Sequence, residues 1–164
     1  MSRNDTRFPL QPLLSVREMR TRSLENELQR RRREQAEAEA RRDQARDELR
    51  RAGEERDAWR IDTWRGLFEG GAPTGLATAR YKQHLALLDQ RIVQLRVALE
   101  AREKELAQAV QAVEAAATVW RKAWRKLDAV GQMKQGWLRE EQDRTEQREE
   151  MAMEELMVHR APAV

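Results

Sequence analysis

A repeating pattern of apolar residues runs through the second half of the chain. From Leu85 onward, apolar side chains recur at alternating steps of three and four residues, and only Arg102 interrupts them. A repeat averaging about 3.5 residues keeps one apolar stripe of a helix facing a partner helix for many turns. The pattern therefore predicts a long helix with a coiled-coil seam. Its seam positions are Leu85, Leu88, Ile92, Leu95, Leu99, Leu106, Ala109, Val113, Ala116, Trp120, Ala123, Leu127 and Val130.

The partner helix is expected in the same chain. The same spacing, counted from Leu14 to Trp59, gives a second and weaker seam in which apolar and polar residues mix. A helix-breaking cluster separates the two seams and contains Gly66, Gly70, Gly71, Pro73 and Gly75. We therefore predict an all-α protein, a long two-helix antiparallel coiled-coil hairpin with a C-terminal helix overhang.

The predicted domain is a single elongated hairpin over residues 1–164. Its parts are a disordered N-terminus (1–11), a first helix (12–68), a tip loop (69–76), a second helix (77–159) and a tail (160–164). If the chain folds back near residue 72, position i of the first helix lies beside about position 144 minus i of the second. Gly131 and Gly136 follow the end of the first helix in this register, and we expect a flexible joint there.

Composition limits the class of protein. Charged residues make up 37% of the chain and aromatic residues only 5%, so the apolar residues suffice for stripes and not for a globular core. The absence of cysteine excludes disulfides and fits a reducing cytoplasm. No apolar run approaches the length of a membrane span, which is about 18 residues or more. We expect a cytoplasmic protein without direct membrane insertion.

Catalytic chemistry has little support in the sequence. The two histidines, His84 and His159, lie far apart in the predicted hairpin, and the glycine cluster has no lysine or preceding strand with which to hold a phosphate. We expect no enzyme activity, no catalytic residue, no cofactor and no metal site.

Nucleic acid is also disfavoured as a partner. The net charge is +3 and residues 30–33 are four consecutive arginines, a pattern that can bind phosphates. Acidic residues such as Glu27, Glu34 and Glu37 flank this run at helical spacing, and they offset its charge through pairs along the helix.

Two other clusters are candidate binding surfaces. Trp59, Trp64 and Phe68 lie close to the predicted tip, where they form either an apolar docking site or a plug that closes the hairpin. At the other end, the register places Arg17 and Arg20 at the level of several cations of the second helix. A collar of like charges that repel one another indicates a binding surface for acidic groups. The cations of the second helix are Arg121, Lys122, Arg125 and Lys126.

Two short segments resemble a known family. The first is Phe8-Pro9-Leu10-Gln11-Pro12-Leu13-Leu14-Ser15-Val16-Arg17, which leads into an Arg/Glu-rich helix. The second is Met133-Lys134-Gln135-Gly136-Trp137-Leu138-Arg139-Glu140-Glu141, followed by Glu146-Gln147-Arg148-Glu149-Glu150-Met151. Both resemble the terminal motifs of the YscO family of type III secretion stalk proteins, whose flagellar relative is FliJ.

This resemblance implies a fold, partners and site residues. Family members form an antiparallel two-helix coiled coil whose terminal end enters a hexameric secretion ATPase and whose tip contacts an export-gate membrane protein; some also handle export chaperones. The matching terminal motifs assign ATPase binding to Leu13, Leu14, Arg17, Trp137, Glu149, Glu150 and Met151, and the basic collar adds Arg20, Arg121, Lys122 and Arg125. The family pattern assigns gate binding to Trp59 and Leu88, to which the aromatic cluster adds Trp64 and Phe68, whereas Glu55 and His84 depart from that pattern.

The resemblance implies a non-enzymatic central stalk that links a secretion ATPase to an export gate at the cytoplasmic face of a type III apparatus, of the virulence type rather than the flagellar one. The alternatives are a generic cytoplasmic coiled-coil scaffold that dimerises through the incomplete first seam, and an adaptor that binds export chaperones.

Overall fold

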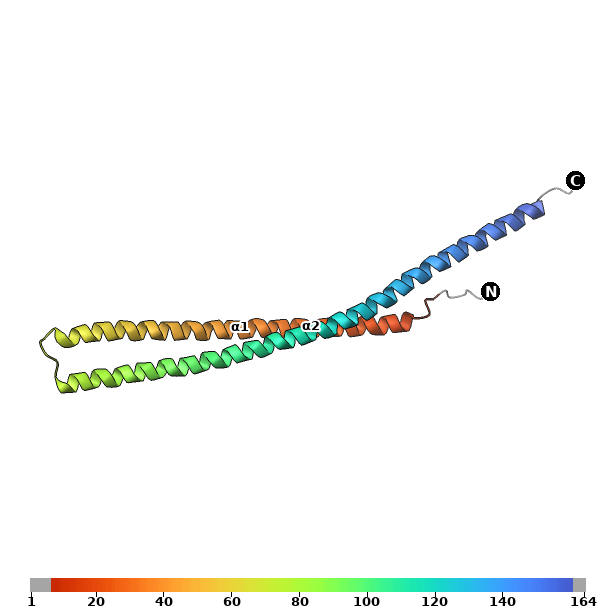
Figure 1. Ribbon diagram of the computed structural model, residues 1–164. Coiled ribbons are helices and arrows are strands. Elements are labelled where there is room, and N and C mark those ends of the chain that lie inside the picture. Colours follow the sequence, from red (N-terminus) through yellow and green to blue (C-terminus); the bar gives the residue numbers. More distant parts are fainter. Residues whose placement is uncertain (1–6, 161–164) are drawn as a thin grey trace. The chain divides into compact units, whose positions relative to one another are not determined.

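Two long helices make up nearly all of the described part of the protein. The computed structural model describes residues 7–160, which form α1 (Gln11–Phe68) and α2 (Gly75–Arg160) (Figure 1). The two helices pack against each other, and no strand occurs among the described residues. The predicted all-α helical hairpin is therefore confirmed.

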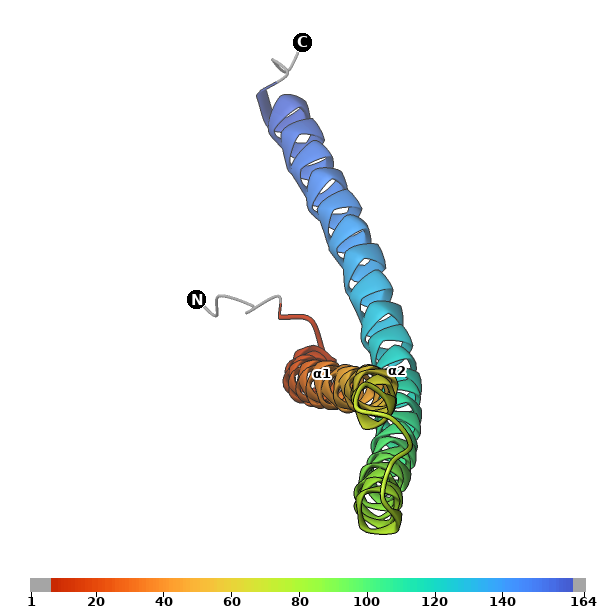
Figure 2. The same cartoon turned by 90° about the vertical axis from the view of Figure 1, so that its left-hand side faces the viewer.

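The connection between the helices follows from its local chemistry. Figure 2 shows the loop that crosses from α1 to α2. Gly71 adopts a φ of 105°, a conformation that only glycine reaches without strain, and its N–H donates to the Phe68 carbonyl at 3.3 Å. Thr74 then caps α2, because its hydroxyl accepts a hydrogen bond from the Ala77 N–H at 3.2 Å. This cap explains why α2 begins at Gly75, two residues before the predicted start.

The start of the chain differs from its prediction. Helix α1 begins at Gln11, and Phe8, expected to be disordered, is only 7% exposed. Its ring lies 5.8 Å from that of Trp137, and it belongs to a buried cluster with Leu14 and Val130. The predicted disorder is therefore wrong at Phe8, because this ring is buried against Leu14, Val130 and Trp137. Residues 1–6 and the predicted tail after Arg160 lie outside the described residues.

The Cα positions divide the chain into two compact units. The tip unit consists of residues 29–115 and holds the loop. The terminal unit consists of the described residues of Met1–Leu28 and Ala116–Val164. Each unit contains a stretch of both helices, so each has its own stretch of seam.

Ion pairs between the helices record the register of the tip unit. The Arg56 guanidinium forms an ion pair with the Asp89 carboxylate at 2.8 Å. The predicted register places position 88, the neighbour of Asp89, opposite Arg56. The hydrogen bond from Arg56 to Asp57, opposed by desolvation and supported by the charge of Asp89, raises the pKa of Arg56. Longer pairs join Arg41 to Glu105 at 3.7 Å and Arg46 to Glu103 at 3.9 Å. Exposed pairs of this kind add little stability, but opposite charges favour this register over shifted ones.

A cluster of large side chains forms the core of the terminal unit. Leu14 packs with Val130, which is its partner in the predicted register, and Leu127 and Trp137 cover this pair. Beyond Trp137, Glu141 is the last residue of α2 that is not exposed. Gly131 and Gly136 lie within the unbroken helix α2.

Burial along the seam corrects one expectation. Every predicted seam position on both helices is buried or half-buried, including the polar ones such as Arg17, Thr21 and Gln35. The seam of α1 was expected to be the weaker one, yet it holds Leu28 at 4% and Ala38 at 2% exposure, the latter being the most deeply buried residue described. Small residues at facing positions, such as Ala116 opposite Leu28 in the register, leave space in the interface between the helices for the side chains of α1. The first seam is thus covered within the chain.

Two glycines should respond oppositely to alanine. A Cβ at Gly53 would meet nothing within 4 Å, so Gly53→Ala should raise the free energy of unfolding by about 0.5–1 kcal/mol through helix propensity. Gly71→Ala should lower it by about 1 kcal/mol, because the positive φ is strained for alanine. Urea denaturation followed by circular dichroism measures both. A loss of stability in Gly53→Ala would show that this stretch of α1 is not a regular helix.

Candidate binding surfaces

The tip unit carries a cluster of aromatic side chains. Trp59 stacks on Tyr81 with ring centroids 5.3 Å apart and contacts the His84 imidazole at 4.4 Å. Trp64 lies 4.9 Å from Phe68 and 5.5 Å from Tyr81. Tyr81 therefore joins the two tryptophans across the hairpin. Trp59 is half-buried, whereas Trp64 and Phe68 each keep 49% of their surface exposed.

The sequence prediction of this cluster was incomplete. Leu88 lines a groove on the seam with Ala52, Glu55 and Leu95. Tyr81 was missed, although the register places position 80 opposite Trp64 and could have indicated it. His84, which departs from the family pattern, takes the place of an aromatic residue by packing its ring on Trp59.

The terminal unit carries a groove with basic rims between α1 and α2. Its cations are Arg17 and Arg20 from α1 and Lys122 and Lys126 from α2. Apolar side chains share the groove, which has a volume of about 360 Å³ and is lined further by Leu13, Val16, Thr21, Leu24, Val119 and Ala123. The guanidinium of Arg17 donates to the Lys126 carbonyl at 2.8 Å, which ties one rim to the other helix. The groove suits a segment with acidic side chains beside apolar ones.

The predicted basic collar is therefore divided between two faces of α2. Lys122 and Lys126 are four residues apart and line the groove, together with Arg17 and Arg20. Arg121 and Arg125 stand one position earlier, about 100° around the helix, and are exposed outside it. The Arg121 guanidinium donates to the Thr118 hydroxyl at 3.4 Å.

Two residues assigned to ATPase binding are core residues. Leu14 is 6% exposed and Trp137 covers it, so both stabilise the terminal unit. Leu13, in contrast, is 39% exposed at the edge of the basic groove.

A second groove of the terminal unit was missed by sequence reasoning. Trp124, Gly131 and Leu138 line it at steps of seven residues along α2, and Leu14 and Leu127 lie beside them. Trp124 and Leu138 are each about half exposed. The heptad spacing of these three residues was the available signal, but the glycine in the middle concealed it.

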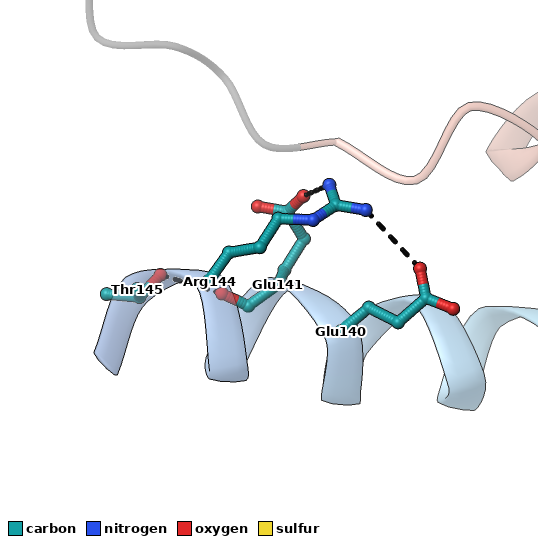
Figure 3. Close-up of polar contacts among 4 residues, drawn as sticks. All are labelled: Glu140, Glu141, Arg144 and Thr145. Carbon is teal, nitrogen blue, oxygen red and sulfur yellow. Dashed lines mark hydrogen bonds and ion pairs between the residues drawn. The ribbon is translucent and has the colours of Figure 1, made fainter. Parts of the chain in front are cut away.

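The last part of α2 carries exposed acidic and apolar side chains. Residues 142–160, which we call the C-terminal segment, are exposed throughout. Glu149 and Glu150 lie in a shallow depression with Glu146 and Met153, and Met151 is 60% exposed. At the start of this segment, Arg144 forms ion pairs with Glu140 and Glu141 on its own helix, and the Thr145 hydroxyl donates to the Glu141 carbonyl (Figure 3).

The described part of the chain holds neither a cluster of metal-ligating side chains nor a membrane-spanning helix. Within residues 7–160, no three His, Asp or Glu side chains gather in a way that could hold a metal ion. Neither α1 nor α2 contains a stretch apolar and long enough to cross a membrane. What the described residues offer is a set of grooves and exposed clusters on the two helices.

The fold defines an all-α helical-hairpin protein, and comparison with known families makes the class specific. The family model of the YscO-like proteins matches residues 5–159, nearly the whole chain. The chain therefore belongs to the YscO-like family, which associates it with type III secretion as an accessory protein. No curated protein and no solved structure gives a significant match.

Proposed function

We propose that this protein is a central stalk that couples the hexameric ATPase of a type III secretion system to the export gate. The observation that carries the proposal is that the hairpin has two surfaces of different chemistry, one in each unit. The tip unit offers half-exposed aromatic rings, and the terminal unit offers a groove with four cations. Membership of the YscO-like family supports the same assignment.

The two surfaces suit the two partners differently. An aromatic cluster with half of its surface exposed is typical of a hot spot that fills a pocket on its partner, here the export gate. A basic groove attracts acidic loops, here those of the ATPase ring. When the terminal unit binds the subunits of the ring unequally, the nucleotide state of the ring becomes linked to the orientation of the stalk. This linkage needs no reactive residue in the chain.

Replacing Trp64 tests the gate surface. Trp64→Ala should weaken binding to the cytoplasmic part of the export gate by about 30-fold, the effect of losing a hot spot of about 2 kcal/mol. Helicity should change little, because the ring is half exposed. Trp124→Ala is a matched control, since Trp124 is also 49% exposed but lies in the terminal unit. Isothermal titration calorimetry with the purified gate domain measures both variants.

The same experiment separates the docking site from the hydrophobic plug. If Trp64→Ala melts the tip while gate binding survives at a temperature where the variant is folded, the cluster is a plug and the gate surface lies elsewhere. Equal losses of affinity in Trp64→Ala and Trp124→Ala would also contradict the assignment. In the stalk model, Trp64→Ala keeps its ability to stimulate the ATPase, because it leaves the terminal unit intact.

A further inference from the structure

A buried hydroxyl lies in the wall of the basic groove. Thr21 lines this groove and is the one polar residue among residues 7–160 that is buried, with 6% of its surface exposed. Its Oγ1 is covered and has no hydrogen-bond partner. Arg56 and Trp120 each hold a covered nitrogen of the same kind, but neither of them lines the groove. A buried hydroxyl without a partner lowers the stability of the fold, because its hydrogen bonds to water are lost and not replaced.

The packing of the seam does not need this hydroxyl. Thr21 stands midway between Leu14 and Leu28 at steps of seven residues, so the three side chains occupy equivalent positions of the heptad. Both leucines are buried, and the register places the small Ala123 opposite Thr21. Valine has nearly the shape of threonine and would fill this position without a polar atom. Nothing in the seam therefore favours threonine over valine here.

Every charged group along the groove is a cation. Arg17 lies one helical turn before Thr21 on the same face of α1, and Lys122 and Lys126 lie one turn apart on α2. Arg20 completes the set, and none of the ten residues that line the groove is acidic. Guanidinium and ammonium groups only donate hydrogen bonds, whereas a carboxylate only accepts them. The groove and its hydroxyl therefore match a carboxylate that comes from another molecule.

We infer that the groove receives the carboxylate of one aspartate or glutamate side chain of a protein partner, and that the Thr21 hydroxyl donates a hydrogen bond to it. Threonine adopts two rotamers in helices, so rotation about its Cα–Cβ bond can turn the covered hydroxyl toward the groove. Apolar neighbours of the acidic residue then cover Leu13, Val16 and Val119, which are exposed in the groove. The inference rests on the proposed function, because it takes the acidic loops of the ATPase ring as the source of the carboxylate.

Two variants of Thr21 separate binding from packing. Thr21→Val removes the unpartnered hydroxyl at nearly constant shape, so the thermal midpoint should rise while the affinity for the purified ATPase falls about tenfold. Thr21→Ser keeps the hydroxyl and loses a buried methyl group, so the midpoint should fall while the affinity stays within about twofold of the wild type. Stability and affinity therefore change in opposite directions in the valine variant. A purely structural role of Thr21 would not lower the affinity of a more stable variant.

Isothermal titration calorimetry measures these affinities, and circular dichroism measures the midpoints. Thr118→Val makes the same chemical change on α2 outside the groove and, as the matched control, should bind the ATPase as the wild type does. If Thr21→Val also binds like the wild type, the stalk function stands and the inference is overturned. A lower midpoint in Thr21→Val would overturn it too, because the hydroxyl would then have a partner in the free protein, such as the Arg17 carbonyl.

A peptide probe tests the groove without the ATPase. The blocked peptide Leu-Glu-Leu carries one carboxylate between two apolar side chains, and its titration should shift the backbone NMR signals of the groove residues until they saturate. The peptide Leu-Gln-Leu should bind the wild type at least about tenfold more weakly, and Thr21→Val should weaken binding of Leu-Glu-Leu about tenfold. If the peptides behave in this way but the ATPase does not bind, the proposed function fails and the carboxylate site stands. If Leu-Glu-Leu binds no better than Leu-Gln-Leu, the inference is overturned, whatever the ATPase does.

Discussion

Replacing Leu28 or Leu95 by alanine should lower the free energy of unfolding by roughly 2–4 kcal/mol. Leu28 is 4% exposed on α1 and Leu95 is 8% exposed on α2. Each substitution removes buried apolar surface and leaves a cavity that the two helices can only partly close. A hairpin has no second layer of side chains behind the seam, so little nearby bulk can fill that space.

Thermal and urea denaturation of matched variants measure this effect. Leu87→Ala is the control, because Leu87 is 58% exposed on the same helix as Leu95. Its replacement should change the stability by no more than about 0.5 kcal/mol. Equal losses for Leu87→Ala and Leu95→Ala would mean that the seam has been assigned to the wrong face of α2.

The seam could be predicted from the sequence because its signal is local and long. A repeat averaging 3.5 residues defines one face of a helix without reference to the rest of the chain, and over many turns a few polar residues do not erase it. Arg56 shows this well. It stands at a seam position, and the structure places it half-buried with its guanidinium on Asp89.

Contacts at the ends of the seam were harder to predict. Phe8 precedes α1, so no helical period places it, and its packing on Trp137 depends on how the chain enters the helix. The depth of burial was equally hidden. The hydrophobicity of α1 alone gave no indication that Ala38 would be the most buried residue described, because that depends on the size of the facing side chains.

The candidate binding surfaces were predicted by composition and corrected by geometry. The sequence grouped the cations of α2 as one collar, but a helix turns by about 100° per residue and so places neighbouring residues on different faces. Lys122 and Lys126 therefore join Arg17 and Arg20 in the groove, whereas Arg121 and Arg125 do not. This division of the cations could have been predicted from helical geometry alone. The hydrogen bond from Arg17 to the Lys126 carbonyl could not be foreseen without coordinates.

This division gives a sharp test of ATPase binding. The groove variant Lys122→Glu/Lys126→Glu should lose the stimulation of ATP hydrolysis by the secretion ATPase, down to the rate of the ATPase alone. Acidic loops that the wild-type groove attracts would meet like charges there. The hairpin should stay folded, because the new carboxylates lie near Arg17 and Arg20 and replace repulsion with attraction.

The off-groove variant Arg121→Glu/Arg125→Glu makes the same change of charge on the other face of α2 and should keep most of the stimulation. A steady-state ATPase assay across a salt series compares the two variants, with circular dichroism as the check on folding. In the wild type, stimulation should fall as salt rises past physiological strength, where the screening length is about 8 Å. If the groove variant stimulates like the wild type at every salt concentration, the basic groove has no part in ATPase binding. The acidic and apolar side chains of the C-terminal segment, with Met151 among them, would then be the surface to test.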